Sequence, residues 1–285
     1  MITVTGATGH LGRLAVADLL ERGVPADQIV AVVRSPEKAA DLAAKGVVVR
    51  TADYARPETL DAALAGTDKL LLISGTEFGQ RLAQHTNVVN AAVAAGVSLI
   101  VYTSIANADT TSNPIAPEHQ ATEVVIRESG LPYVFLRNSW YFENYTENLA
   151  PVLQSGVVLG AAGDGQISAA TRADYAAAAA AVLTGDGPVN VAYELGGDTP
   201  FTLAEYAAEV ARQTGKQIAY QNVSEEEYAQ ALLGFGMPEP FARTLAGVDT
   251  SITKGELFVG SGDLSRLAGR PTTSLADAVA LALKN

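Results

Sequence analysis

Residues 4–12 read Val4-Thr5-Gly6-Ala7-Thr8-Gly9-His10-Leu11-Gly12, and this stretch decides the fold of the chain. It follows a β-branched run and precedes a segment with helical periodicity, which predicts a strand, a glycine turn and a helix. Glycines in such a turn let the backbone bend sharply and approach a pyrophosphate, and the helix N-terminus attracts phosphate. We therefore expect a dinucleotide site formed by residues of this turn, namely Gly6, Thr8, Gly9, His10, Leu11 and Gly12. The alternative is a glycine turn that binds no ligand.

The first half of the chain alternates between strands and helices. Besides residues 2–5, strands are expected at residues 28–33, 47–50, 69–73, 98–103 and 132–136. Helices are expected at residues 11–22, 36–44, 77–95 and 117–129. The strands are continuous apolar runs, which is typical of strands covered on both faces. The fold class is therefore α/β, a Rossmann-type doubly wound parallel sheet.

The pattern changes after Arg137. Residues 138–145 are polar and aromatic, residues 156–165 are rich in turn formers, and a helix at 172–183 and a strand at 189–195 are expected to return to the sheet. Thr202 and Glu205 form a capping box that begins a helix ending at Gln213. We expect this helix to be followed by a short strand at 216–221 and by short helices at 224–233, 239–245 and 275–283. We predict an NAD(P)-binding domain of residues 1–137 and about 166–196, and a smaller, mostly helical substrate lobe of residues 138–165 and 197–285.

Composition narrows the function classes. Among 285 residues, 48% are hydrophobic and the formal net charge is −12, so general nucleic-acid or anionic-membrane binding is not expected. The chain has no cysteine, which excludes disulfides, thiolate metal sites and cysteine nucleophiles. His10, His85 and His119 lack metal-ligand spacing, and we predict no metal site. The alanine-rich run 175–183 is too short to span a membrane, and no leader is apparent, so we expect a cytoplasmic protein.

The choice of dinucleotide depends on the end of the second strand. An NAD site usually has a carboxylate there for the ribose 2′-hydroxyl, but this strand ends in Arg34. Arginine can meet a 2′-phosphate with a charge-assisted pair, so NADP(H) is preferred and NAD(H) stays an option. The alternative for Arg34 is a solvated surface side chain. Asp53, after the third strand, either approaches the adenine or caps a turn.

Motifs along nearly the whole chain resemble the NmrA-like atypical short-chain dehydrogenases, and more narrowly the bacterial NAD(P)H:quinone oxidoreductases of type 2 and the triphenylmethane reductases. The matching segments are residues 5–12, 31–34, 52–54, 70–74, 102–104, 136–145, 161–165, 170–175 and 269–273. The aromatic block Arg137 to Tyr145 and the block around Arg172 are more specific than the glycine motif.

The resemblance implies a two-lobed NADPH-binding reductase. Residues 6–12 and Arg34 would then hold the pyrophosphate and the 2′-phosphate. Further cofactor-binding residues on this pattern are Ser74, Gly75, Thr76, Thr103, Asn138, Trp140, Tyr141, Glu143 and Arg172. For Trp140, Tyr141 and Tyr145, packing between the lobes is an equal alternative.

The usual acid of short-chain dehydrogenases is missing. None of the tyrosines has a lysine four residues later, and the helix from Glu118 to Glu128 contains no lysine. A quinone accepts hydride to give a weakly basic hydroquinone anion, so positioning against the nicotinamide can provide most of the catalysis. If a proton donor exists, His119 is the first candidate and Tyr141 the second. The alternative for His119 is packing or capping.

Two functions remain open from the sequence. The first is an NADPH-dependent oxidoreductase that transfers hydride to a quinone or a related planar aromatic compound, with a polycyclic metabolite of a tailoring pathway as a variant. The second is an NmrA-like redox sensor that binds NAD(P) without turnover. In either case we expect a small-molecule ligand, no nucleic acid and no membrane, and a homodimer is an open alternative.

Overall fold

The computed structural model describes residues 1–147 and 149–284. A seven-stranded sheet, in which every pairing is parallel, has the order β3-β2-β1-β4-β5-β6-β8. Its strands are β1 (Ile2–Thr5), β2 (Ile29–Val33), β3 (Val48–Thr51), β4 (Lys69–Leu72), β5 (Leu99–Ile105), β6 (Tyr133–Asn138) and β8 (Val191–Leu195). Every residue of β2 and β5 is buried, as expected for strands covered on both faces. The predicted Rossmann-type sheet is confirmed.

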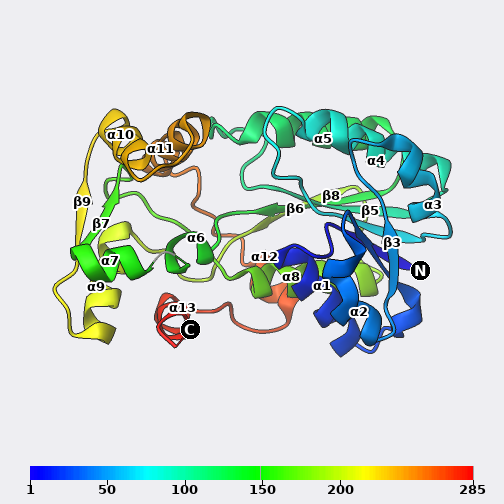
Figure 1. Cartoon of the computed structure of the whole chain (residues 1–285), viewed down its shortest axis with the longest axis horizontal. Helices are drawn as coiled ribbons and strands as arrows, with labels where there is room; N and C mark the ends of the chain where they lie inside the picture. The colour runs from blue at the N-terminus through cyan, green and yellow to red at the C-terminus, as the bar shows by residue number, and fades with distance from the viewer. Residues whose placement is uncertain (148, 285) are drawn as a thin grey trace.

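Helices cover both faces of this sheet (Figure 1). One face carries α1 (His10–Glu21), α2 (Ala40–Ala44), α8 (Arg172–Thr184) and α12 (Asp263–Ala268), whose buried side chains share one core cluster. The other face carries α3 (Leu60–Leu64), α4 (Arg81–Ala94) and α5 (Ala116–Glu128), which share a second cluster. Short 3₁₀ turns at Ala26–Gln28, Pro36–Ala39 and Pro57–Thr59 complete this part.

A smaller lobe lies at the other end of the molecule (Figure 1). It is built from α6 (Glu143–Thr146), α7 (Leu149–Ser155), β7 (Val157–Gly160), α9 (Leu203–Thr214), β9 (Ala219–Asn222), α10 (Glu225–Gly234), α11 (Glu239–Thr253) and α13 (Leu275–Ala282). β7 and β9 pair in parallel, and a separate core cluster of apolar side chains fills the lobe. The predicted capping box is present, with the Thr202 hydroxyl accepting from the Glu205 N–H.

The structure differs from the sequence prediction in several elements. The helix expected at 77–95 begins only at Arg81, because Gly79 has a left-handed backbone (φ 78°) that a helix cannot continue. The helix expected at 239–245 continues to Thr253, and β7 and α12 were not predicted. α12 also packs against α8 and β8 with Leu264 fully buried, so this segment of residues 197–285 joins the large sheet rather than the smaller lobe. The rest of the predicted domain division stays a prediction.

The direction of the strands positions the site. Because all pairings in the sheet are parallel, the carboxyl ends of its strands lie along one edge, where ligands bind in open α/β sheets. Gly6, Arg34, Ser74 and Ser139 follow β1, β2, β4 and β6 there or close to it. The chain crosses to the smaller lobe after β6, returns for α8 and β8, and crosses again after Leu195.

Candidate active site

The glycine turn connects β1 to α1. Gly6 has a left-handed backbone (φ 61°), and its carbonyl accepts the Gly9 N–H at 2.9 Å. A Cβ at Gly12 would lie 2.3 Å from the Gly6 carbonyl oxygen, so only glycine lets the helix approach the turn this closely. No described side chain caps α1, which leaves its first N–H groups available to a ligand. Leu11 points into the core, whereas Gly6, Gly9 and His10 are exposed. This cradle fits a pyrophosphate.

Arg34 follows β2 directly, as predicted, and it has a partner that the sequence did not reveal. Its Nη1 lies 2.7 Å from Oε1 of Glu77, and both side chains are largely exposed. Glu77 lies in the loop between β4 and α4, a segment predicted as helix, and therefore its approach to the end of β2 was missed. The side chain at this strand end is thus an arginine paired with a carboxylate.

Asp53 lies in a turn after β3. Its Oδ1 accepts the Ala55 N–H at 2.9 Å, and its own N–H donates to the Thr59 hydroxyl at 3.0 Å. The turn-capping role is therefore present in the structure, and the adenine contact stays a prediction.

The start of the loop after β4 is held by buried side chains. The Ser74 N–H donates to the Thr103 hydroxyl at 2.9 Å, and the Gly75 N–H donates to His85 Nε2 at 3.0 Å. Burial, with the nearby Arg81, lowers the pKa of His85 to about 3, so its ring is neutral and can accept this bond. Thr76 is exposed beyond this anchored part. His85 was not predicted to support the site, because its contact with Gly75 depends on the packing of α4.

Four predicted residues meet at the carboxyl end of β6. Asn138 is buried, and its Nδ2 donates to the Tyr141 hydroxyl at 3.4 Å. The Arg172 guanidinium lies over the Tyr141 ring, 5.2 Å from its centroid, and the Arg172 N–H donates to Glu143 Oε1 at 2.8 Å. Among the described residues, Asn138 Oδ1 and Glu143 Oε2 are buried acceptors without a partner. These two unpaired acceptors lie near the carboxyl end of β6 and suit a ligand with N–H donors, such as a carboxamide.

Glu147 connects this cluster to the glycine turn. Its Oε1 lies 2.6 Å from Arg172 Nη1 and 3.5 Å from His10 Nδ1. The segment after α6, the first turn of α1 and the start of α8 therefore meet around one carboxylate. Glu147 was not predicted, because nothing in its local sequence distinguishes it from a surface glutamate.

The two candidate proton donors have different surroundings. His119, on α5, is buried with its Nδ1 2.8 Å from the Tyr102 hydroxyl, and burial, Arg81 and His85 hold its pKa well below the usual value. Tyr141 is partly buried in edge-on contact with the Tyr175 ring, and burial raises its pKa. The packing alternatives for His119 and for Trp140, which contacts the core of the smaller lobe, are thus present in the structure.

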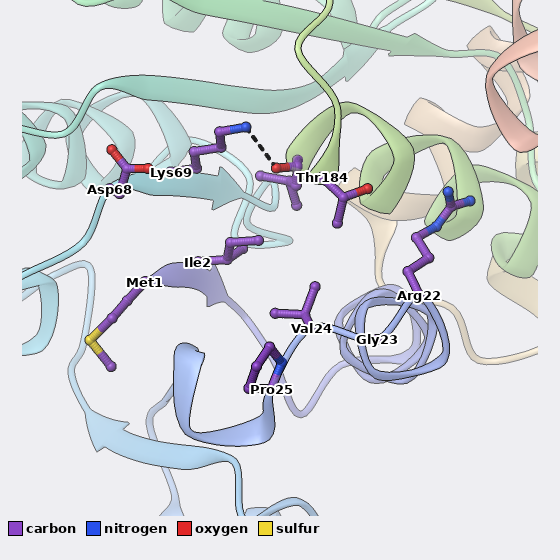
Figure 2. A pocket seen from close by; sticks show the side chains of 10 residues that line it. Met1, Ile2, Arg22, Gly23, Val24, Pro25, Asp68, Lys69 and Thr184 are labelled. Atoms are coloured by element: carbon purple, nitrogen blue, oxygen red, sulfur yellow. Dashed lines mark hydrogen bonds between the residues drawn. The ribbon is translucent and has the colours of Figure 1, made fainter.

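One cavity lies away from this site. It has a volume of about 330 Å³ and lies at the amino ends of β1 and β4, between Met1, Pro25 and Thr184 (Figure 2). Lys69 Nζ donates there to the carbonyl oxygens of Leu183 and Gly185, both at 3.0 Å, and so caps α8. A second cavity of about 260 Å³ lies between α3 and α4 around Asp61 and Asn87. Neither cavity is lined by residues of the glycine turn. The candidate site is therefore placed from the residues at the carboxyl ends of the strands and not from a cavity.

A buried carboxyl group lies in the smaller lobe. Asp249, on α11, accepts the Ala161 N–H at 2.8 Å, and no described cation pairs with it. Burial raises its pKa to about 6, although the Ala161 bond opposes this shift. The folded state therefore binds a proton that the unfolded state has already released, and the stabilisation from this proton is lost as the pH rises through 6.

We expect Asp249→Asn to stabilise the chain at pH 8 by about 1–3 kcal/mol, because the amide still accepts the Ala161 N–H without a buried charge. The difference should shrink toward pH 5. Urea unfolding at both pH values measures it, with the exposed Asp186→Asn as the control. An equal effect at both pH values would contradict the pKa assigned to Asp249.

Comparison with known proteins agrees with this geometry. The model of the NAD(P)H-binding family matches residues 6–186. Quinone oxidoreductase 2 of Escherichia coli is 52% identical over 279 residues, which cover 98% of this chain and 97% of the relative. The chain belongs to the NAD(P)H-binding family.

Two solved structures match the whole fold. The structure of Escherichia coli NADPH-dependent quinone oxidoreductase 2 with NADPH has a TM-score of 0.97 and covers 100% of both chains. Citrobacter triphenylmethane reductase complexed with NADP(H) has a TM-score of 0.95 at 44% identity, with coverage of 99% and 100%. The resemblance predicted from the motifs, to NmrA-like reductases of these two kinds, is confirmed. Among the described residues, no helix is long and apolar enough to cross a bilayer.

Proposed function

We propose that this chain is an NADPH-dependent oxidoreductase that transfers hydride to quinones or related planar aromatic compounds. The observation that carries the proposal is the 52% identity, across nearly the whole chain, to quinone oxidoreductase 2. The structural match to that enzyme in complex with NADPH supports both the cofactor and an enzymatic function. These findings support the enzyme and not the alternative of a redox sensor without turnover.

We assign the cofactor to the edge formed by the glycine turn, Arg34 and the Asn138 cluster. The uncapped start of α1 would bind the pyrophosphate, and Arg34 would bind the 2′-phosphate. Asn138 Oδ1 and Glu143 Oε2, both buried acceptors, would receive the carboxamide N–H groups of the nicotinamide. Bound NADPH would supply the hydride, and the protein's task is to fix the position of the ring and exclude water.

Hydride transfer to a quinone does not require a side chain that donates a proton. A hydroquinone anion is far less basic than an alkoxide, so water can protonate the product after transfer. His119 is neutral at neutral pH and bonded to Tyr102, whereas Tyr141 lies beside Asn138 under a guanidinium. If a donor takes part, Tyr141 has the better position.

A turnover assay tests this function. Purified protein is mixed with NADPH and a panel of benzoquinones, naphthoquinones, anthraquinones and a triphenylmethane dye, and loss of NADPH absorbance is followed. We expect oxidation to accelerate with at least one planar acceptor over the rate without acceptor. Binding of NADPH with no acceleration by any acceptor would support the sensor instead.

We also propose that the protein acts in the cytoplasm on small molecules and not on nucleic acid. The net charge of −12 repels phosphate backbones and supports this part of the proposal. A homodimer stays a prediction, which the molar mass in solution, measured by light scattering, tests directly.

A further inference from the structure

Glu77 uses an N–H group of Arg34 that a 2′-phosphate would also need. Its Oε1 lies 2.7 Å from Arg34 Nη1, which is the contact expected between that guanidinium and a phosphate oxygen. Its Oε2 accepts a bond from Gln84 Nε2 at 2.7 Å. Both carboxylate oxygens of Glu77 therefore have donors, and the carboxylate acts as an internal anion at the site.

The surrounding loop holds Glu77 in this place. The N–H groups of Gly79 and Arg81 donate to Glu118 Oε1 at 3.1 and 3.2 Å, which fixes the end of the loop to α5. Next to Glu77, the Phe78 ring meets the Phe241 ring of α11 edge-on, with centroids 5.1 Å apart. The loop thus spans from the large sheet to the smaller lobe.

The energetic balance allows a ligand to displace Glu77. The side chains of Arg34 and Glu77 are 66% and 49% exposed, and ion pairs of this kind contribute only about 0–1 kcal/mol. A phosphate monoester carries about −1.5 to −2 charges near neutral pH, so it attracts Arg34 more strongly than a carboxylate does and repels Glu77. A ribose 2′-hydroxyl, in contrast, is a donor that a carboxylate accepts.

We propose that Glu77 is a cofactor-selectivity residue: its carboxylate competes with the 2′-phosphate of NADPH for Arg34 and accepts the 2′-hydroxyl of NADH. The proposal rests on the proposed function only in taking NAD(P)H as the ligand. Arg34 alone would favour NADPH strongly, and Glu77 reduces that preference. The chain therefore uses both dinucleotides, with an NADPH preference smaller than Arg34 alone would give.

Binding titrations on the full chain test the proposal without turnover. The Kd values of NADPH and NADH are measured by nicotinamide fluorescence for the unmodified chain, Glu77→Gln, Arg34→Ala and the double variant. Glu77→Gln should tighten NADPH binding about 3- to 10-fold and weaken NADH binding about 2- to 5-fold. Arg34→Ala should weaken NADPH binding about 10- to 100-fold with little effect on NADH. In the Arg34→Ala background, the NADPH gain from Glu77→Gln should shrink.

Glu226→Gln is the matched control. Glu226 also lies between an arginine, Arg243 at 3.2 Å, and a glutamine, Gln230 at 2.9 Å, but on α10 of the smaller lobe. This variant makes the same change in charge and should leave both Kd values unchanged.

The outcomes separate the two proposals. If Glu77→Gln changes NADPH and NADH binding equally, or weakens NADPH binding, the role of Glu77 is overturned while the proposed function stands. If the unmodified chain binds neither dinucleotide, the proposed function itself fails. If Glu77→Gln and Glu226→Gln changed the Kd values equally, the effect would come from the change in net charge alone. That result would also overturn the role of Glu77.

Discussion

Gly12→Ala is expected to weaken NADPH binding about 100-fold and to lower the free energy of unfolding by about 1–3 kcal/mol. The added Cβ would lie 2.3 Å from the Gly6 carbonyl oxygen and 2.7 Å from the Ala7 Cα. Both are backbone atoms, so no rotamer change can relieve the overlap and α1 must move away from the turn. Its N–H groups then no longer point to the position of the pyrophosphate.

The control for this prediction is another helical glycine with space around it. Gly234 lies at the end of α10, and a Cβ there meets nothing within 4 Å. Gly234→Ala should leave NADPH binding unchanged and stabilise the chain by up to about 1 kcal/mol. Fluorescence titration and urea unfolding of both variants provide the measurement. Unchanged NADPH affinity in Gly12→Ala would mean that the glycine turn is not the pyrophosphate site.

Arg137→Met is expected to lower the free energy of unfolding by about 3–5 kcal/mol, because it leaves a buried charge without its main partner. Arg137 and Glu123 are 5% and 2% exposed, and they form two hydrogen bonds of 2.9 and 2.7 Å. Asp109 and Glu194 also accept from the guanidinium, at 2.7 and 3.1 Å. Burial alone would lower the pKa of Arg137, but the bonds to these three carboxylates raise it, so the group stays charged.

A double-mutant cycle separates the lost partner from the lost packing. Glu123→Gln removes the charge but keeps a hydrogen-bonding side chain of the same shape beside Ser104, which donates to Glu123 at 2.6 Å. The double variant with Arg137→Met should be less destabilised than the sum of the single variants, since no buried carboxylate is then left with Arg127, at 2.9 Å, as its one remaining cation. If the changes in the free energy of unfolding, measured with urea, were additive, the loss of the ion pair would not be the cause of the destabilisation.

The large sheet could be predicted because its signals are local. Continuous apolar runs identify β2 and β5, and a β-branched run before the glycine turn identifies β1. Thr202 with Glu205 marks the start of α9 within four residues of sequence. The order of the strands follows from general handedness and packing rules for alternating strands and helices. The same locality explains why the glycine turn was found first.

Other parts depended on partners far away in the chain. β7 is a strand because β9, about sixty residues later, pairs with it. α12 packs on the large sheet because its Leu264 is buried against α8 and β8. In the site, Arg34 was identified from its place after β2, but Glu77 and Glu147 were missed. Their roles arise from contacts with Arg34 and with Arg172 and His10, which no local pattern encodes.

The repeated crossing of the chain between the lobes has a consequence for cooperativity. β8, which pairs with β6 along its whole length, comes after α6, α7 and β7 in the chain. A chain cut at residue 186, where the family match ends, would expose the backbone of β6 as an open edge strand prone to aggregation. We therefore expect that the Rossmann-type part does not fold on its own, and that thermal unfolding follows a single transition that includes both lobes.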